Sequence, residues 1–279
     1  MRHDCETLVA PLFEPANRPD RFVKAAASGA DAVILDLEDA VPADAKEGAR
    51  QAIHRVALAK PVIVRINGVG TPWHELDCAA LTGLKVAAIM LPKTERAADL
   101  ARVAAIAPVI GLIETARGLA EARAIARSGL VARLAFGSVD YAVDVGCEHC
   151  REALACARAE IVLASRLGGL PSPLDGVTTD IDSVKAVRND ARAARRVGFG
   201  GKLLIHPSQV SAVLEQFRPD AAAIAWARRV VASGEGAVRL DGAMVDAPVR
   251  ARARAILTSA ASRDVVFGGD GPDHGCDAI

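Results

Sequence analysis

The chain has 279 residues, enough for one large domain with additions, and 51% of them are hydrophobic. Its 34 basic and 34 acidic residues cancel, which excludes a strong overall attraction to nucleic acid or to an acidic membrane. No apolar run reaches the ~20 residues of a membrane span, and the first residues lack an apolar signal core. We therefore expect a cytoplasmic protein that binds neither nucleic acid nor membranes and keeps its six cysteines reduced.

Apolar runs alternate with helical segments along the first two hundred residues. Near-continuous apolar runs are typical of parallel strands buried on both faces. Eight such units predict an α/β fold, a TIM (β/α)8 barrel. An open doubly wound sheet is the alternative, although no Gly-rich phosphate loop follows the first strand. The expected strands are 7–13, 32–37, 62–66, 86–91, 109–113, 132–136, 175–178 and 202–205, and the expected helices are 18–28, 44–57, 97–105, 119–128, 151–167 and 183–196.

The barrel is expected to occupy residues 1–218. Within it, residues 140–151 are predicted to form a polar loop after the sixth strand. Residues 219–265 are predicted to be an additional C-terminal helical or lid extension, in which a short Asp/Gly-containing connection joins two helices. The Gly- and Asp-rich tail, 266–279, is expected to be disordered.

Two carboxylates follow successive predicted strands, Glu114 after the fifth and Asp140 after the sixth. Neighbouring strands lie ~4.8 Å apart, so the two side chains can share one cation. Two carboxylates together with water and substrate oxygens suit Mg²⁺. The alternative is that each carboxylate caps a helix or pairs with an arginine.

Three acids surround the end of the second strand: Asp36, Glu38 and Asp39. Acids this close repel one another unless cations or donors offset them. Glu38 and Asp39 are candidate catalytic residues that order metal-bound water or position Arg65 or Lys93. Alternatively, they simply begin the next helix. Asp36 needs a partner if it faces the core.

Two basic residues end the third and fourth strands. Arg65 lies inside an apolar strand, and a buried guanidinium fits a carboxylate or a developing oxyanion. A structural salt bridge to Glu38 or Glu114 is the competing interpretation. Lys93 follows Pro92 and is either a substrate-binding residue or a solvated residue at a helix start.

The loop after the sixth strand carries Cys147, His149 and Cys150, with Cys156 further along. These residues invite a zinc interpretation, but the second ligand pair of a structural zinc site is missing. His206 ends the eighth strand and is a candidate ligand contact or a structural histidine.

Eight motifs in order resemble the citrate lyase β-subunit-like group of the HpcH/HpaI aldolase superfamily. The similarity extends from about residue 8 to residue 260. Glu14 departs from it, because the group often has a small-residue turn at this position. The motifs are EPANRPDRFVKA (14–25), LDLEDAV (35–41), VRIN (64–67), MLPKTE (90–95), IETARGL (113–119), FGSVDYA (136–142), GKLLIHPSQV (201–210) and DGAMVDAPV (241–249).

The resemblance implies a role for each matching site residue. It makes Glu114 and Asp140 the Mg²⁺ ligands and Arg65 the catalytic arginine. It also implies a homotrimer or hexamer in which Asp246 completes a neighbouring subunit's site. Its further assignments are the amides near Gly137 and Ser138 for the oxo-acid carboxylate, and the segment with Arg18 and Lys24 for the CoA phosphates.

The resemblance implies a lyase that cleaves a 3-hydroxyacyl-CoA thioester, with CoA as part of the substrate and Mg²⁺ as cofactor. The products are acetyl-CoA and an oxo acid, released by retro-Claisen chemistry. Citryl-, citramalyl-, malyl- and methylmalyl-CoA all remain open as substrates. The alternatives are a malyl-CoA-type thioesterase, or a citrate lyase β subunit that acts on a citryl thioester of an acyl-carrier protein within a complex.

Overall fold

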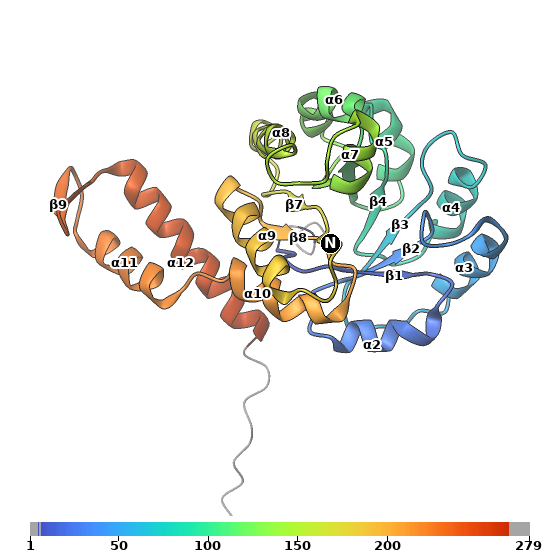
Figure 1. The fold of residues 1–279 in the computed structure, drawn as a ribbon, viewed down its shortest axis with the longest axis horizontal. Coiled ribbons are helices and arrows are strands. Elements are labelled where there is room, and N and C mark those ends of the chain that lie inside the picture. Colours follow the sequence, from blue (N-terminus) through green and yellow to red (C-terminus); the bar gives the residue numbers. More distant parts are fainter. Residues whose placement is uncertain (1–4, 6, 268–279) are drawn as a thin grey trace, which may run out of the picture. The chain divides into compact units, whose positions relative to one another are not determined.

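The computed structural model describes Cys5 and residues 7–267, with the backbone alone for residue 259 and residues 261–267. Eight parallel strands pair in chain order, and the sheet that they form is curled (Figure 1). The two ends of the sheet meet, since the amides of Lys202 and Leu204 donate to Val9 O (2.7 Å) and Pro11 O (3.0 Å). The expected TIM barrel is therefore confirmed. The strands are β1 (Leu12–Pro15), β2 (Val33–Asp36), β3 (Val62–Arg65), β4 (Ala88–Leu91), β5 (Val109–Ile113), β6 (Arg133–Phe136), β7 (Leu174–Asp175) and β8 (Gly201–Lys202).

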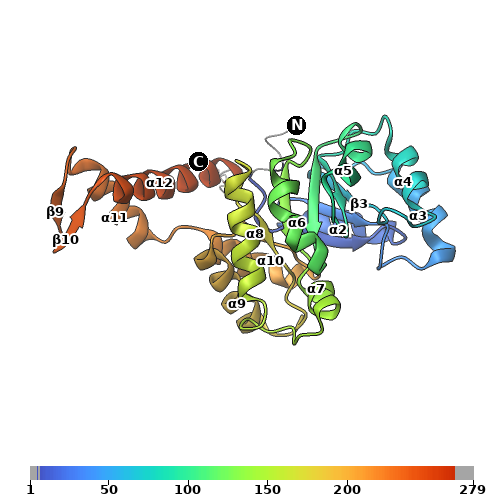
Figure 2. The same cartoon turned by 90° about the horizontal axis from the view of Figure 1, so that it is seen from above.

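Helices follow the strands and cover the outside of the sheet (Figure 2). The helix at residues 97–104, for example, buries its apolar residues Leu100 and Val103. The helices are α2 (Phe22–Ala27), α3 (Lys46–Ile53), α4 (His74–Leu81), α5 (Ala97–Ala104), α6 (Ala116–Arg127), α7 (Ser138–Val145), α8 (Ala155–Leu167), α9 (Val184–Val197) and α10 (Val210–Phe217), with short 3₁₀ turns η1 (Pro19–Arg21), η2 (Ala43–Ala45) and η3 (Pro207–Gln209).

The prediction of a loop at residues 140–151 is wrong for its first part, because helix α7 covers Ser138–Val145. Val, Asp, Ser and Tyr all have modest helix propensity, so the segment has no helical signal of its own. Tertiary contacts supply the stability: the Tyr141 ring packs edge-on against Phe136, with centroids 5.5 Å apart. Gly146 then ends the helix in the left-handed conformation (φ 72°).

The barrel has two apolar cores. One fills the inside of the sheet and includes Ile34, Ile63, Met90 and Leu112. The other lies between the sheet and its helices, where Leu35 faces outward next to inward-facing Ile34. Alternation along each strand divides its side chains between the two cores. Packing on both faces therefore fixes the strand ends, and the fixed strand ends position the residues that follow them.

The chain divides into two compact units, with the boundary between Phe217 and Arg218. The second unit contains α11 (Ala221–Ala232), the antiparallel strands β9 (Val238–Leu240) and β10 (Ala243–Val245), and α12 (Ala247–Phe267). Asp241 and Gly242 join the two strands, both with positive φ (51° and 81°), as a two-residue hairpin requires. Buried Val230, Val245 and Ala253 form its core.

The sequence predicted the two helices of the second unit but missed the hairpin between them. Of the tail expected at 266–279, the first two residues end α12, and the rest lies outside the described residues. None of the helices in the described part of the chain is both long enough and apolar enough to cross a bilayer.

Candidate active site

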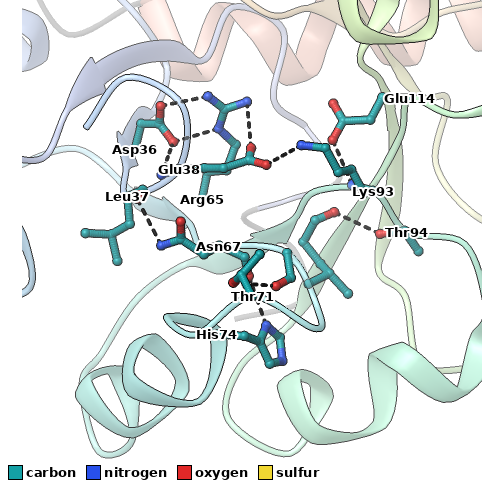
Figure 3. Close-up of polar contacts among 12 residues, drawn as sticks. Asp36, Leu37, Glu38, Arg65, Asn67, Thr71, His74, Lys93, Thr94 and Glu114 are labelled. Carbon is teal, nitrogen blue, oxygen red and sulfur yellow. Dashed lines mark hydrogen bonds and ion pairs between the residues drawn. The ribbon is translucent and has the colours of Figure 1, made fainter. Parts of the chain in front are cut away.

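The polar residues that end β2, β3, β4 and β5 gather at one edge of the barrel (Figure 3). Asp36 ends β2 and Arg65 ends β3, and the two are direct partners in the register of these strands. Lys93 follows β4 and Glu114 follows β5. In parallel barrels this carboxyl edge is where side chains from several strands converge.

Arg65 is held by a buried two-point ion pair with Asp36. Its Nε and Nη2 each donate to one oxygen of the Asp36 carboxylate, both at 2.7 Å. Asp36 also accepts from the amides of Glu38 (2.9 Å) and Ala40 (3.0 Å). Burial alone would lower the pKa of Arg65, but the bonds to Asp36 raise it above its usual value. The partner that Asp36 was expected to need is therefore Arg65.

Glu38 links Arg65 to Lys93. Its two carboxylate oxygens lie 3.2 Å from Arg65 Nη1 and 2.6 Å from Lys93 Nζ. Burial raises the pKa of Glu38, and the charges of Arg65 and Lys93 oppose that shift. The result is a chain of alternating charges from Asp36 to Lys93. Arg65 Cζ also lies over the Phe13 ring, 4.9 Å from its centroid.

The backbone amide of Lys93 donates a hydrogen bond to the Glu114 carboxylate. Lys93 has a positive φ of 47°, which is uncommon for a residue with a side chain. In this conformation its amide donates to Glu114 Oε1 at 2.7 Å, while its side chain reaches Glu38. Strained conformations of this kind cluster at functional sites, where surrounding contacts maintain them.

Glu114 is the most perturbed acid of the site. The residue is 1% exposed, and its Oε2 has no hydrogen-bond partner among the described residues. A β-carbon on Gly137 would lie 2.5 Å from the Glu114 β-carbon, so only glycine fits beside this carboxylate. Burial, and then the charges of Glu38 and Asp140, raise the pKa of Glu114 to about 8. A bound cation would relieve both the desolvation and the repulsion.

Glu114 and Asp140 fit a divalent cation. Asp140 lies in the first turn of α7, close enough for its charge to act on Glu114. No group of three His, Cys, Asp or Glu side chains suited to a metal occurs within residues 5 and 7–267. Two carboxylates match Mg²⁺, which keeps several water or substrate ligands. The orphaned Glu114 oxygen is the structural sign of such a site.

The start of α7 brings Gly137 and Ser138 to the same edge as Glu114. The first backbone bond of this helix runs from Tyr141 N to Gly137 O (3.0 Å). The Gly137 amide, expected to bind a carboxylate, donates instead to Ile113 O (2.9 Å). The amides of the first turn, from Ser138 onward, have no partner within the helix and remain available to an anion. Ser138 itself is 1% exposed, and its Oγ lies 2.9 Å from His149 Nε2.

Three of the expected site residues are exposed on the barrel, and a fourth belongs to the second unit. Asp39 is exposed beside Glu38, and Lys24 is exposed on α2. Arg18 is exposed and bonds Asp20 with Nε (3.0 Å) and Nη2 (2.9 Å). Asp246 belongs to the second unit, where its Oδ1 accepts from Val249 N (3.3 Å) at the start of α12.

The residues that support the loops after β2 and β3 were not predicted from the sequence. Buried Lys46 donates to Leu37 O (2.7 Å), Glu38 O (2.8 Å) and Asn67 Oδ1 (2.8 Å). Asp77 accepts from both the backbone and the side-chain nitrogen of Asn67 (2.8 and 2.6 Å). A signal existed: Lys46 occupies the first position of the i, i+3, i+4, i+7 set that buries one face of α3.

Asp36→Asn is expected to lower the free energy of unfolding of the barrel by about 3 kcal/mol, because it leaves the buried Arg65 without its charged partner. Urea denaturation at pH 7 measures this loss. Asp20→Asn is the matched control, since Asp20 receives the same two bonds from the exposed Arg18. Because the Arg18–Asp20 pair is exposed to solvent, its loss is expected to change the free energy of unfolding far less. Equal losses in the two variants would contradict the structural role of Asp36.

The stability of the metal-free protein is expected to fall as the pH rises from 4.5 to about 8. In that range folded Glu114 keeps a proton that the unfolded chain, with the ordinary pKa of 4.5, releases. Glu114→Gln removes this penalty, so in EDTA at pH 8 the variant is expected to melt at a higher temperature than the unsubstituted protein. Mg²⁺ is expected to reverse the order by stabilising only the protein that retains Glu114. Identical melting curves in EDTA would refute the pKa assignment.

Comparison with known proteins identifies relatives along most of the chain. The HpcH/HpaI aldolase/citrate lyase family matches residues 10–207. A "Citrate lyase subunit beta-like protein" of Mycobacterium tuberculosis is 40% identical over 260 residues, which cover 89% of this chain and 94% of that protein. Two Cereibacter sphaeroides proteins are a "(3S)-malyl-CoA thioesterase" (34% over 269 residues, 88% and 92% covered) and an "L-malyl-CoA/beta-methylmalyl-CoA lyase" (33% over 297 residues, 89% and 93% covered).

Among solved structures, the protein CitE from Mycobacterium tuberculosis in complex with magnesium, acetoacetate and coenzyme A superposes with a TM-score of 0.84. It is 39% identical and covers 94% of this chain and 100% of its own. The resemblance predicted from the eight motifs is thus confirmed. The chain belongs to the HpcH/HpaI aldolase/citrate lyase family, a family of lyases.

Proposed function

We propose that this protein is a Mg²⁺-dependent lyase that cleaves a 3-hydroxyacyl-CoA thioester of the citramalyl-, citryl- or malyl-CoA type into acetyl-CoA and an oxo acid. The observation that carries the proposal is the buried, unpartnered Oε2 of Glu114 beside the charge of Asp140. Relatives whose names specify malyl-CoA chemistry, and a similar structure that holds magnesium and coenzyme A, support it.

Glu114 and Asp140 would hold the metal, which supplies Lewis-acid polarisation of a substrate oxygen when bound. The remaining chemistry belongs to the chain. Arg65 offsets the negative charge that builds on oxygen as the carbon–carbon bond breaks. Asp36 and Glu38 hold the guanidinium in place with bonds of 2.7 Å and an ion pair of 3.2 Å, so it does not reorganise during the reaction. Glu38 and Lys93 also keep the charge of the site balanced.

The rest of the substrate meets residues near the barrel edge. The Gly137 amide already donates to Ile113 O (2.9 Å), so the amides of the first turn of α7, from Ser138 onward, bind the carboxylate that becomes part of the oxo acid. The exposed cations of the β1–α2 region, Arg18 and Lys24, meet the CoA phosphates at the mouth of the site. Asp39 lies exposed beside Glu38 and orders water there.

Asp246 of a neighbouring subunit is proposed to exchange a proton with the enolate carbon, in a homotrimer or hexamer located in the cytoplasm. Co-expression of Asp140→Ala and Asp246→Ala chains tests this role. Each variant alone is expected to be inactive, whereas random mixed assembly in a symmetric ring restores about one quarter of the sites. Failure of the mixture to recover activity, with mixed oligomers demonstrated by mass spectrometry, would exclude donation across subunits.

A thioesterase is the second candidate, because one relative is named as a malyl-CoA thioesterase. A lyase releases acetyl-CoA and an oxo acid, whereas a thioesterase releases free CoA and the hydroxy acid. A third arrangement, suggested by the names of the citrate lyase relatives, is a subunit that needs an acyl-carrier protein.

Product analysis separates these possibilities. The purified protein is incubated with Mg²⁺ and malyl-, citramalyl- or citryl-CoA, and the products are separated by chromatography. We expect the protein to release acetyl-CoA from at least one of these esters, without releasing free CoA. Release of free CoA alone would identify a thioesterase, and activity only on an acyl-carrier-protein thioester would identify a complex subunit.

A further inference from the structure

Ser138, at the first position of α7, is fixed by a contact from outside the proposed catalytic cluster. Its Oγ lies 2.9 Å from Nε2 of His149, in the loop that follows α7. Ser138 is 1% exposed, so its hydroxyl has few alternatives to this bond. His149 itself is exposed and lines an open cavity of about 280 Å³ between α8, α9 and the end of β7.

Gly176 holds Ser138 from a second side. A β-carbon at residue 176 would lie 2.6 Å from the Ser138 β-carbon and 3.0 Å from Phe136 O. The backbone after β7 can approach this closely only because residue 176 is a glycine. Ser138 is therefore enclosed between the His149 ring and the Gly176 backbone.

The Gly176 backbone is itself anchored by a buried charge cluster. Lys202, 1% exposed at the end of β8, donates to Gly176 O and lies 3.6 Å from Asp175 Oδ2. Arg158 on α8 donates to the other oxygen of Asp175 at 2.9 Å. An ammonium buried this completely requires partners, and the Gly176 carbonyl is one of them.

We propose that His149, with Gly176 anchored by Lys202, positions Ser138 and through it the first turn of α7. That turn carries Asp140 two residues later and the unpaired amides proposed for the oxo-acid carboxylate. The inference rests on the proposed function of this edge of the barrel. His149 touches no reacting atom in this scheme and acts through Ser138, which gives the Cys147–Cys150 loop a role that its sequence did not reveal.

The length of the side chain at position 149 provides the test. Glutamine places an amide nitrogen or oxygen near the position of His Nε2, whereas asparagine is too short to reach Ser138. We expect His149→Asn to lower kcat by about 10-fold or more, as removal of a residue that supports a metal ligand typically does. His149→Gln is expected to recover most of that loss. Both variants are expected to keep the melting temperature of the unsubstituted protein.

Chemical rescue adds a readout that a purely structural role would not change. The open cavity beside His149 admits imidazole, so imidazole is expected to restore part of the activity of His149→Ala. It is not expected to help Ser138→Ala/His149→Ala, which lacks the partner hydroxyl. His54→Asn on the exposed end of α3 is the matched histidine control and is expected to be fully active.

The outcomes distinguish this inference from the proposed function. An active unsubstituted protein with an equally active His149→Asn variant would overturn the positioning role alone. If the unsubstituted protein cleaves none of the thioesters, the lyase proposal fails. Calorimetric titration of pyruvate with Mg²⁺ present then tests positioning: weaker binding to His149→Asn than to His149→Gln supports it, and equal or absent binding overturns it.

Discussion

Asp140→Ala is expected to lower kcat by at least about 10³-fold while the barrel stays folded. A metal contributes several kcal/mol of charge stabilisation in a transition state, and each ~1.4 kcal/mol changes the rate tenfold. Glu114 alone cannot retain the ion well, because it offers one free buried oxygen. Asp140 is only partly buried in the first turn of α7, so its removal leaves the apolar cores intact.

Three measurements test the effect of Asp140→Ala. Steady-state assays give kcat, circular dichroism gives the melting temperature, and Mn²⁺ titration followed by electron paramagnetic resonance gives metal binding. Glu121→Ala is the control, because Glu121 is an exposed acid on the neighbouring helix α6. Its activity and metal affinity are expected to be unchanged. An Asp140→Ala variant that retains full activity would refute the metal assignment.

Arg65→Lys is expected to lower kcat by about 10²–10³-fold, the loss typical of removing one donor from a preorganised oxyanion site. Lysine retains the positive charge but cannot bond both oxygens of Asp36 while also contacting Glu38, as the Arg65 fork does. Its ammonium would therefore settle on one carboxylate and turn away from the substrate oxygen.

Arg123→Lys is the matched control for this substitution. Arg123 makes the same two-point contact to Glu160, at 2.6 and 2.8 Å, on the exposed surface of α6 and α8. Its replacement is expected to leave kcat and KM unchanged. An Arg65→Lys enzyme with normal kcat would show that charge alone suffices and that the geometry of the Asp36 pair has no catalytic role.

The strands of the barrel were predictable because apolar side chains dominate them on both faces. The run at 109–113 coincides with β5, and its neighbours differ by one or two residues. The strands at the two ends of the sheet were predicted less well: β1 begins five residues after the expected start at 7, and the two-residue strands β7 and β8 each begin one residue before the expected starts at 175 and 202. Helix α7 escaped prediction because tertiary contacts, which include the Phe136–Tyr141 pair, stabilise it against weak propensity.

The site was predictable to the extent that strand ends reveal it. Arg65, Lys93, Glu38 and Glu114 were expected at the barrel edge, and the structure brings them into one cluster. The choice of Asp36 as the main partner of Arg65 depends on the register of β2 against β3, which no local pattern encodes. The bond from Ser138 to His149 likewise spans a helix that the sequence did not show.

A crystal of the protein grown with Mn²⁺ in place of Mg²⁺, analysed by anomalous scattering, tests the central claim most directly. We expect an anomalous peak within bonding distance of both Glu114 Oε2 and an Asp140 carboxylate oxygen. A peak bound elsewhere, or a fully ordered site in which the two carboxylates turn apart and hold no ion, would contradict it.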